Sequence, residues 1–284
     1  MDINVIKNYQ VFTQVKDHIF VSERIWNKDE GKVTRLHLTE NEQLTIDNDF
    51  YLYRYLPFSR LYAELKNHTL TLISPQKWED PYEALFFNKK PNAFTGKQIN
   101  CLCFTYNRFS GEEAAWKIRK DDEPVVKICI NFHELIDRLF LMANNHKNPL
   151  DFYISLCNYN LNKSDIDKTY TKYKSSGDEI QTDEYLNLMS IKRKAFAHEC
   201  EIRLFAVSKD NEKKEVLSIK GINYNGLITE ILLPPLKGYK QDDSRSDYYT
   251  DIQDIYNKGM KDFFNEYFHP ITKQSRLYQC DCKD

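Results

Sequence analysis

Two glutamates stand two residues apart at the start of an apolar segment, and an arginine follows at the same spacing. The segment reads Glu199-Cys200-Glu201-Ile202-Arg203-Leu204-Phe205. Residues i, i+2 and i+4 of a strand share one face, so Glu199, Glu201 and Arg203 are predicted to line up on one side. Carboxylates placed in this way can act as a general base or stabilise a cation. The alternative is a solvent-facing strand, in which a Glu–Arg pair contributes less than about 1 kcal/mol.

A second group of polar residues follows a predicted strand that ends at Ser74. It reads Ser74-Pro75-Gln76-Lys77-Trp78-Glu79-Asp80-Pro81-Tyr82-Glu83. Loops at the ends of strands often hold ligands, and the rings of Trp78 and Tyr82 can stack on a base or on nicotinamide. The alternative interpretation is structural, with Trp78 as a core anchor and Asp80 as the cap of a turn or helix.

A third candidate is Arg54, which lies between Tyr53 and Tyr55 in a predicted strand. An arginine in an aromatic strand must either pair with a partner or point away from the core. Its guanidinium can form a two-pronged contact with a phosphate or a carboxylate. The alternative is an exposed residue on a half-buried strand.

Several common kinds of site are disfavoured. The chain has only 8 glycines, with neither Gly-x-Gly-x-x-Gly nor Gly-x-x-x-x-Gly-Lys, so a nucleotide would have to be held by side chains. The pairs Cys101-x-Cys103 and Cys280-x-Cys282 lack zinc-site spacing, and the 7 histidines are scattered. We therefore expect no metal.

Composition bounds the class of protein. The chain has 284 residues, of which 41% are hydrophobic and 29% charged, which excludes wholesale disorder. The net charge of −2 provides no general attraction to nucleic acid or anionic lipid. The first residues do not form a secretory signal, no apolar run is long enough to span a membrane, and the 7 cysteines are odd in number. These features predict a cytoplasmic protein with reduced thiols.

The order of the predicted elements indicates an α+β fold with a mixed or antiparallel central sheet and a helical insertion. Residues 1–45 are predicted to form an N-terminal extension with helical spacing over 5–20, and residues 39–49 a linker. Residues 46–284 are predicted to form a single α+β domain of the catalytic type. Its helical insertion covers about 133–198, including a helix over 150–159, and a long helix covers 247–268. The predicted strands cover residues 50–56, 68–74, 100–105, 125–132, 201–207, 215–219, 227–233 and 276–278.

Several of these motifs together resemble a bacterial family known as domain of unknown function 2971. The resemblance covers about residues 50–235. It is carried by Leu52-Tyr53-Arg54-Tyr55, by the Ser-Pro…Asp-Pro-x-Glu element at 74–83, by Trp116, by Lys192 and by residues 198–204. Trp78-Glu79 stands where that family has Phe-Asn.

A more distant resemblance points to ADP-ribosyltransferases, one branch of which uses an arginine, a serine and a Glu-x-Glu in this order. This resemblance implies that Arg54 binds the diphosphate of NAD, that Ser74 orients the nicotinamide side and that Tyr55 or Trp78 stacks on nicotinamide. It also implies that Glu201 stabilises the oxocarbenium-like transition state and that Glu199 assists the acceptor. Asp80 belongs to the same cofactor-binding region. A split sheet of that family's kind is the implied fold.

The favoured hypothesis is therefore an NAD-dependent ADP-ribosyltransferase that acts as a bacterial toxin or phage-defence effector. Its acceptor would be a protein, RNA or DNA, and an antitoxin or regulatory protein is a further expected partner. A Mg²⁺-dependent nuclease that uses Asp80, Glu199 and Glu201 is one alternative. A non-catalytic binding module is another, in which Asp80 and Glu83 brace the sheet.

Overall fold

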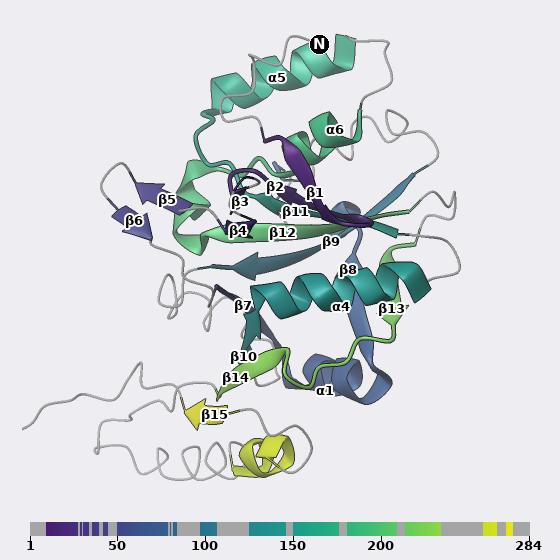
Figure 1. Ribbon diagram of the computed structural model, residues 1–284. Coiled ribbons are helices and arrows are strands. Elements are labelled where there is room, and N and C mark those ends of the chain that lie inside the picture. The colour runs from purple at the N-terminus through teal and green to yellow at the C-terminus, as the bar shows by residue number, and fades with distance from the viewer. Residues whose placement is uncertain are drawn as a thin grey trace, which may run out of the picture.

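A mixed β-sheet of eleven strands forms the centre of the fold (Figure 1). The structure is a computed structural model that describes residues 10–27, 29, 31–33, 36–39, 42–44, 50–78, 80, 82–83, 97–106, 125–145, 150–175, 181–208, 214–233, 258–265 and 271–274. The strands of the sheet are β1 (Phe12–Lys16), β2 (Ile19–Ser22), β7 (Tyr51–Pro57), β8 (Thr69–Ile73), β9 (Gln98–Thr105), β10 (Val125–Asn131), β11 (Leu150–Leu156), β12 (Glu201–Ser208), β13 (Val216–Lys220), β14 (Ile228–Leu233) and β15 (Ile271–Gln274).

The main path of the sheet runs β1-β2-β11-β12-β9-β7-β10-β14-β15, and β8 pairs with both β9 and β13. Among the described strands, only the pairs β2–β11 and β14–β15 are parallel. The expected α+β class with a mixed, mainly antiparallel sheet is therefore confirmed. The two other sheets have two strands each and pair β3 (Trp26–Asn27) with β4 (Lys32–Val33) and β5 (Leu36–Thr39) with β6 (Glu42–Leu44).

The helices cover both faces of the sheet. They are α1 (Phe58–Asn67), α4 (Phe132–Asn145), α5 (Lys163–Ser175), α6 (Thr182–Met189) and a helix over residues 258–265, with short 3-10 turns at η2 (Pro75–Lys77) and η3 (Lys194–Glu199). In Figure 1, α4 crosses the front of the sheet, and α5 and α6 lie above it beside the N-terminal strands.

The two faces carry different residues because side chains alternate along each strand. On one face, which we call the α1 face, Leu204 and Leu102 pack with residues of α1 and α4 in the larger hydrophobic cluster. On the opposite face, the α6 face, Phe205 and Cys101 pack with residues of α6 in a second cluster. Glu201 and Arg203 share the strand parity of Phe205, so they lie on the α6 face.

The predicted helix over 150–159 is wrong, because this segment forms strand β11, which lies between β2 and β12. The error has a physical cause. Six of the seven β11 residues are buried, so the strand lacks the alternation of polar and apolar residues that marks a strand with one solvated face. The predicted helical insertion therefore contains a central strand of the sheet.

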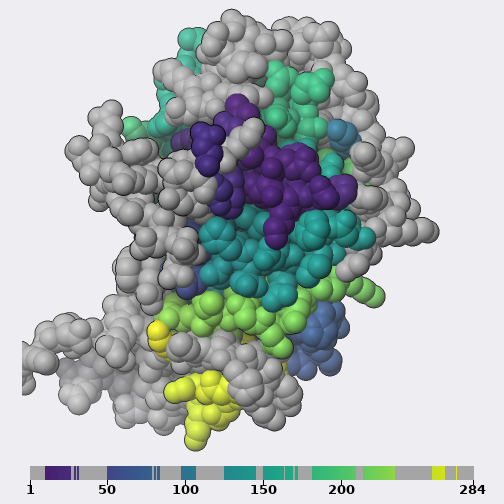
Figure 2. Space-filling model, in the orientation of Figure 1, coloured from purple at the N-terminus to yellow at the C-terminus, as the bar shows by residue number. Residues whose placement is uncertain are grey.

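The predicted helical spacing over residues 5–20 is also wrong within the described part. Strands β1 and β2 form a hairpin whose turn contains His18 at a positive φ of 62°. Residues 39–44 of the predicted linker include strand β6. Figure 2 shows β1 and β2 (purple) beside α4 (teal) on one surface, where Lys16 pairs with Asp137.

Other predictions lie partly or wholly outside the described residues. They are Glu79, Trp116, the strand over 276–278 and the ends of the helix over 247–268. Within the described part, no helix is both long and apolar enough to cross a membrane.

Candidate functional site

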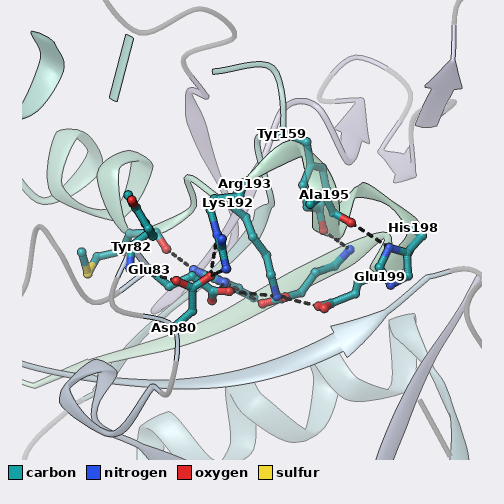
Figure 3. A network of polar contacts seen from close by, with 12 residues as sticks. Asp80, Tyr82, Glu83, Tyr159, Lys192, Arg193, Ala195, His198 and Glu199 are labelled. Atoms are coloured by element: carbon teal, nitrogen blue, oxygen red, sulfur yellow. Dashed lines mark hydrogen bonds and ion pairs between the residues drawn. The ribbon is translucent and has the colours of Figure 1, made fainter. Parts of the chain in front are cut away.

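A buried lysine is the centre of a polar network on the α6 face (Figure 3). Lys192 Nζ lies 2.6 Å from Glu201 Oε2, 2.5 Å from Glu199 Oε2 and 3.1 Å from Glu83 Oε1. The side chain of Glu199 is 34% exposed, whereas those of Lys192 and Glu201 are 7% and 6% exposed. Glu199 is therefore the carboxylate of this group that faces solvent.

Arg203 is the second cation of the network and contacts two of the same glutamates. Its Nε donates to Glu201 Oε1 at 2.6 Å, its Nη2 to Glu83 Oε2 at 2.5 Å and its Nη1 to the Met189 carbonyl at 2.5 Å. The guanidinium lies over the Trp78 ring, 4.3 Å from its centroid. We call Glu83, Lys192, Glu199, Glu201 and Arg203 the carboxylate network. Three carboxylates face two cations in it, so it carries one net negative charge when all are ionised.

A second ion pair lies at the rim of the network. Arg193 donates from Nε and Nη2 to Asp80 Oδ2 at 3.0 and 2.8 Å. Its guanidinium is 5.1 Å from the Tyr82 ring and 4.8 Å from the Phe196 ring. Two aromatic rings and a partly exposed arginine therefore border the solvent-facing side.

Backbone contacts hold the network in place. Asp80 accepts from the amide of Tyr82 through Oδ1 at 2.9 Å, which organises the turn that presents Glu83. The amide of Lys192 donates to the Asn158 carbonyl, and the amide of Glu201 donates to the Tyr159 hydroxyl at 2.9 Å. Cys200 lies between the two glutamates and adopts a left-handed φ of 46°. This conformation is costly for a residue with a Cβ.

This turn corrects the predicted alignment of Glu199, Glu201 and Arg203 along one strand. Strand β12 begins at Glu201, and Glu199 belongs to η3. Glu199 reaches the network from outside the strand through Lys192. The alternative of a solvent-facing strand is wrong, because Glu201 is 4% and Arg203 0% exposed.

The two glutamates that share Lys192 have opposite pKa shifts. Burial raises the pKa of Glu199 above its usual value, and the attraction of Lys192 offsets only part of this rise. Burial also acts to raise the pKa of Glu201, but Arg203 and Lys192 outweigh it and hold this pKa well below its usual value. Burial acts to lower the pKa of Lys192, but Glu201 and Glu83 hold it above its usual value. The two cations therefore favour the ionised form of Glu201, and Glu199 is the carboxylate of the network that is partly exposed to solvent.

The structure does not bring Arg54 to the network, contrary to its predicted role. Glu201 pairs with Thr105, and Thr105 pairs with Tyr53, so these three side chains share the α6 face. The next residue, Arg54, therefore points to the α1 face, where its Nη1 and Nη2 contact Glu64 at 2.7 and 3.1 Å. Both side chains are almost fully buried, so Arg54 is a structural partner of α1.

This placement predicts that Arg54→Lys lowers stability and leaves NAD binding alone. Lysine keeps the charge but loses the two-pronged contact, so the free energy of unfolding is expected to fall by about 1–3 kcal/mol. Urea unfolding and the KM for NAD measure the two effects. A large rise in the KM of Arg54→Lys for NAD without a loss of stability would instead support the predicted role of Arg54 in binding NAD.

Ser74 makes no hydrogen bond with the carboxylate network within the described part of the chain, and its predicted role in orienting nicotinamide stays a prediction. Ser74 is buried, and its Oγ accepts from the Gln76 amide at 3.4 Å as the cap of η2. Tyr55 lies on the α6 face, with its ring 5.2 Å from Lys127 Nζ. Trp78 and Asp80 are the predicted cofactor-site residues that join the site, through Arg203 and Arg193.

Sequence reasoning missed Lys192 and Glu83 as members of the site. Neither residue was assigned a catalytic or cofactor-binding role: Lys192 entered through the family resemblance, and Glu83 was given a bracing role in the binding-module alternative. Arg203 and Glu83 meet although they are 120 residues apart in the sequence. Two sequence signals pointed to these residues: the family resemblance includes Lys192, and the Ser-Pro…Asp-Pro-x-Glu element ends at Glu83.

The expectation of no metal stays a prediction. Within the described residues, no group of three histidine, cysteine, aspartate or glutamate side chains has the geometry to hold a metal ion. The ammonium of Lys192 occupies the point at which Glu83, Glu199 and Glu201 converge, so it supplies the positive charge there.

No family model matches this chain, and no curated protein has a matching sequence. The resemblance over residues 50–235 therefore stays a prediction.

Proposed function

We propose that the protein is an NAD-consuming ADP-ribosyltransferase in which Glu199 contacts the substrate. The observation that carries the proposal is the pair of glutamates that share Lys192 and have opposite pKa shifts. Two neighbouring carboxylates whose environments separate their pKa values are typical of acid–base catalysis. The partial exposure of Glu199 supports its assignment as the reacting group.

The chemistry requires a negative environment and one mobile proton. The bond between C1′ of the ribose and the nicotinamide nitrogen breaks, and its electron pair leaves with nicotinamide. The net negative charge of the carboxylate network would stabilise the ribosyl cation. Glu199 would accept the proton of the acceptor group as that group forms the new bond to C1′. In this scheme Glu201 is a positioning residue, because it acts through Lys192.

The rim residues supply the binding surface in this proposal. Tyr82 and Phe196 are rings on which nicotinamide can stack. Their proximity to Arg193 and to the network supports this placement. We extend the proposal to the fold, with the sheet as a variant of the ADP-ribosyltransferase-like split sheet.

The acceptor is tested with labelled NAD. Purified protein is incubated with adenine-labelled NAD and bacterial lysate, and the lysate is then digested with protease or nuclease. Label that becomes protease-sensitive identifies a protein acceptor, and label that becomes nuclease-sensitive identifies RNA or DNA. Either result supports a toxin or defence effector that modifies a macromolecule. Free ADP-ribose as the only product would replace transfer with hydrolysis.

The pH dependence of the reaction follows from the role of Glu199. A general base must be ionised, so kcat/KM is expected to rise with pH through the pKa of Glu199. Because burial raises this pKa above 4.5, the acid limb is expected at a pH above 4.5. A pH profile of nicotinamide release measures it. A profile that stays flat down to pH 4.5 would contradict the assignment.

A further inference from the structure

Arg24 lies just after the end of β2 and makes no ion pair or side-chain hydrogen bond within the described part of the chain. Its backbone amide donates to Ser22 Oγ at 3.2 Å. Its Nη1 is shielded from solvent and has no hydrogen-bond partner, and the residue as a whole is partly exposed. The guanidinium is therefore a half-buried cation whose Nη1 meets no acceptor from the described residues.

The described ionisable groups that act on Arg24 do not neutralise its charge. Burial lowers the pKa of Arg24, and the ionisable groups that act against this shift are Tyr106 and Cys157. Burial raises the pKa of both the Tyr106 hydroxyl and the Cys157 thiol, so both are neutral at pH 7. A shielded cation without a counter-charge destabilises a fold, because its hydration is lost without replacement. An unsatisfied buried donor of this kind points to a group that the described residues do not supply.

Arg24 lies at the same edge of the sheet as the carboxylate network. Strands β2, β9 and β11 end at this edge and β12 begins there. The amide of Cys157 donates to the Glu201 carbonyl at 3.0 Å, and the amide of Tyr106 donates to the Cys200 carbonyl at 3.1 Å. The two neighbours of Arg24 are thus hydrogen-bonded to the backbone carbonyls of Cys200 and Glu201.

A further donor belongs to this edge. The Tyr159 hydroxyl accepts from the Glu201 amide, and a phenolic oxygen that accepts can still donate its own proton. Tyr159 lies close enough to Cys157 for the two groups to affect each other's titration. Arg24 and Tyr159 therefore both lie near Cys157.

We propose that Arg24 binds a phosphate group of a ligand at this edge of the sheet. The guanidinium presents paired N–H donors that match the oxygens of a phosphate or diphosphate. Bound phosphate would supply both the missing counter-charge and the missing acceptor. The proposal concerns anion binding alone, so it does not depend on NAD consumption.

The test uses inorganic pyrophosphate and the full chain at constant ionic strength. Isothermal titration is expected to show binding to the wild type and an affinity about ten-fold or more weaker for Arg24→Gln. Arg138→Gln is the matched control and should bind like the wild type, because Arg138, whose Nε is also shielded and has no partner among the described residues, already has Glu134 as a counter-charge at 3.2 Å. Equal affinity of the wild type and Arg24→Gln, or no binding to the wild type, would overturn the proposal.

Thermal unfolding without ligand separates binding from folding. Because no described group compensates the charge of Arg24, Arg24→Gln is expected to unfold at the same temperature as the wild type or a higher one. Pyrophosphate should raise the unfolding temperature of the wild type and leave that of Arg24→Gln unchanged. A clearly lower unfolding temperature for unliganded Arg24→Gln would show that the chain itself satisfies Arg24, which contradicts the proposal. Arg24→Lys, which keeps the charge, is expected to bind with intermediate affinity.

Discussion

Replacing Glu199 with glutamine is expected to lower the rate of nicotinamide release about 10²–10⁴-fold while the fold survives. The glutamine side chain has nearly the same size and can still accept a hydrogen bond from Lys192, but it cannot accept a proton from the substrate. Because Glu199 is the most exposed carboxylate of the network, its replacement leaves the buried contacts of Glu201 intact. Nicotinamide release under saturating NAD measures the effect.

Glu134→Gln is the matched control for this variant. Glu134 is also paired with a cation, at 3.2 Å from Arg138, but it lies on α4, which covers the opposite face of the sheet. The control should keep wild-type activity. Full activity of Glu199→Gln, or an equal loss in Glu134→Gln, would remove Glu199 from the reaction.

Replacing Glu201 with glutamine is expected to lower the free energy of unfolding by about 3–5 kcal/mol, because Lys192 and Arg203 lose their most buried anion and keep only Glu83 as a shared one. Glu201 accepts from both Arg203 and Lys192, and both cations are at least nine-tenths buried. The neutral amide would also place N–H donors against donors. Urea unfolding at pH 7 measures this loss, with Glu134→Gln as an exposed pair expected to change stability by less than about 1 kcal/mol.

The same variant has a defined dependence on pH. The pKa of Glu201 is lower in the folded protein than in the unfolded chain, where it is about 4.3. A depressed pKa contributes stability that is present above the unfolded value and is lost as the pH falls below it. The difference in stability between the wild type and Glu201→Gln should therefore be constant near neutral pH and shrink below about pH 4.3. A difference that grows on acidification would contradict the ion pairs.

This stability effect changes how the site is tested. Loss of activity in Glu201→Gln has two causes that one assay cannot separate, because the variant also loses the support of Lys192 and Arg203. Glu199 is free of this difficulty. The variant that tests catalysis most clearly is therefore Glu199→Gln rather than Glu201→Gln.

Local sequence patterns predicted most strands but could not predict which face of the sheet each polar residue occupies. The strand with Arg54 was predicted correctly from its aromatic residues. Its face depends on the pairing of Tyr53 with Thr105 and of Thr105 with Glu201, which is a property of the tertiary structure. The expected cofactor site was therefore divided between two faces.

Local sequence patterns could not predict that three glutamates contact Lys192, because these contacts also depend on the tertiary structure. Glu83 and Lys192 belong to separate loops, which meet only because η3, β11 and β12 bring them together at one edge of the sheet. Strand β11 itself was missed because burial on both faces removes its alternation. By contrast, the Glu199–Arg203 segment stood out because charged residues rarely begin a buried strand.

The central claim, that this network consumes NAD, is tested most directly by nicotinamide release from the wild-type protein. The protein is incubated with NAD, with Mg²⁺ or with a chelator, alone and with bacterial lysate, and free nicotinamide is quantified. We predict release that does not require Mg²⁺ and that exceeds the release by Glu199→Gln at the same protein concentration. No release under any of these conditions from folded protein would contradict the account, and Mg²⁺-dependent cleavage of nucleic acid in the same samples would favour the nuclease.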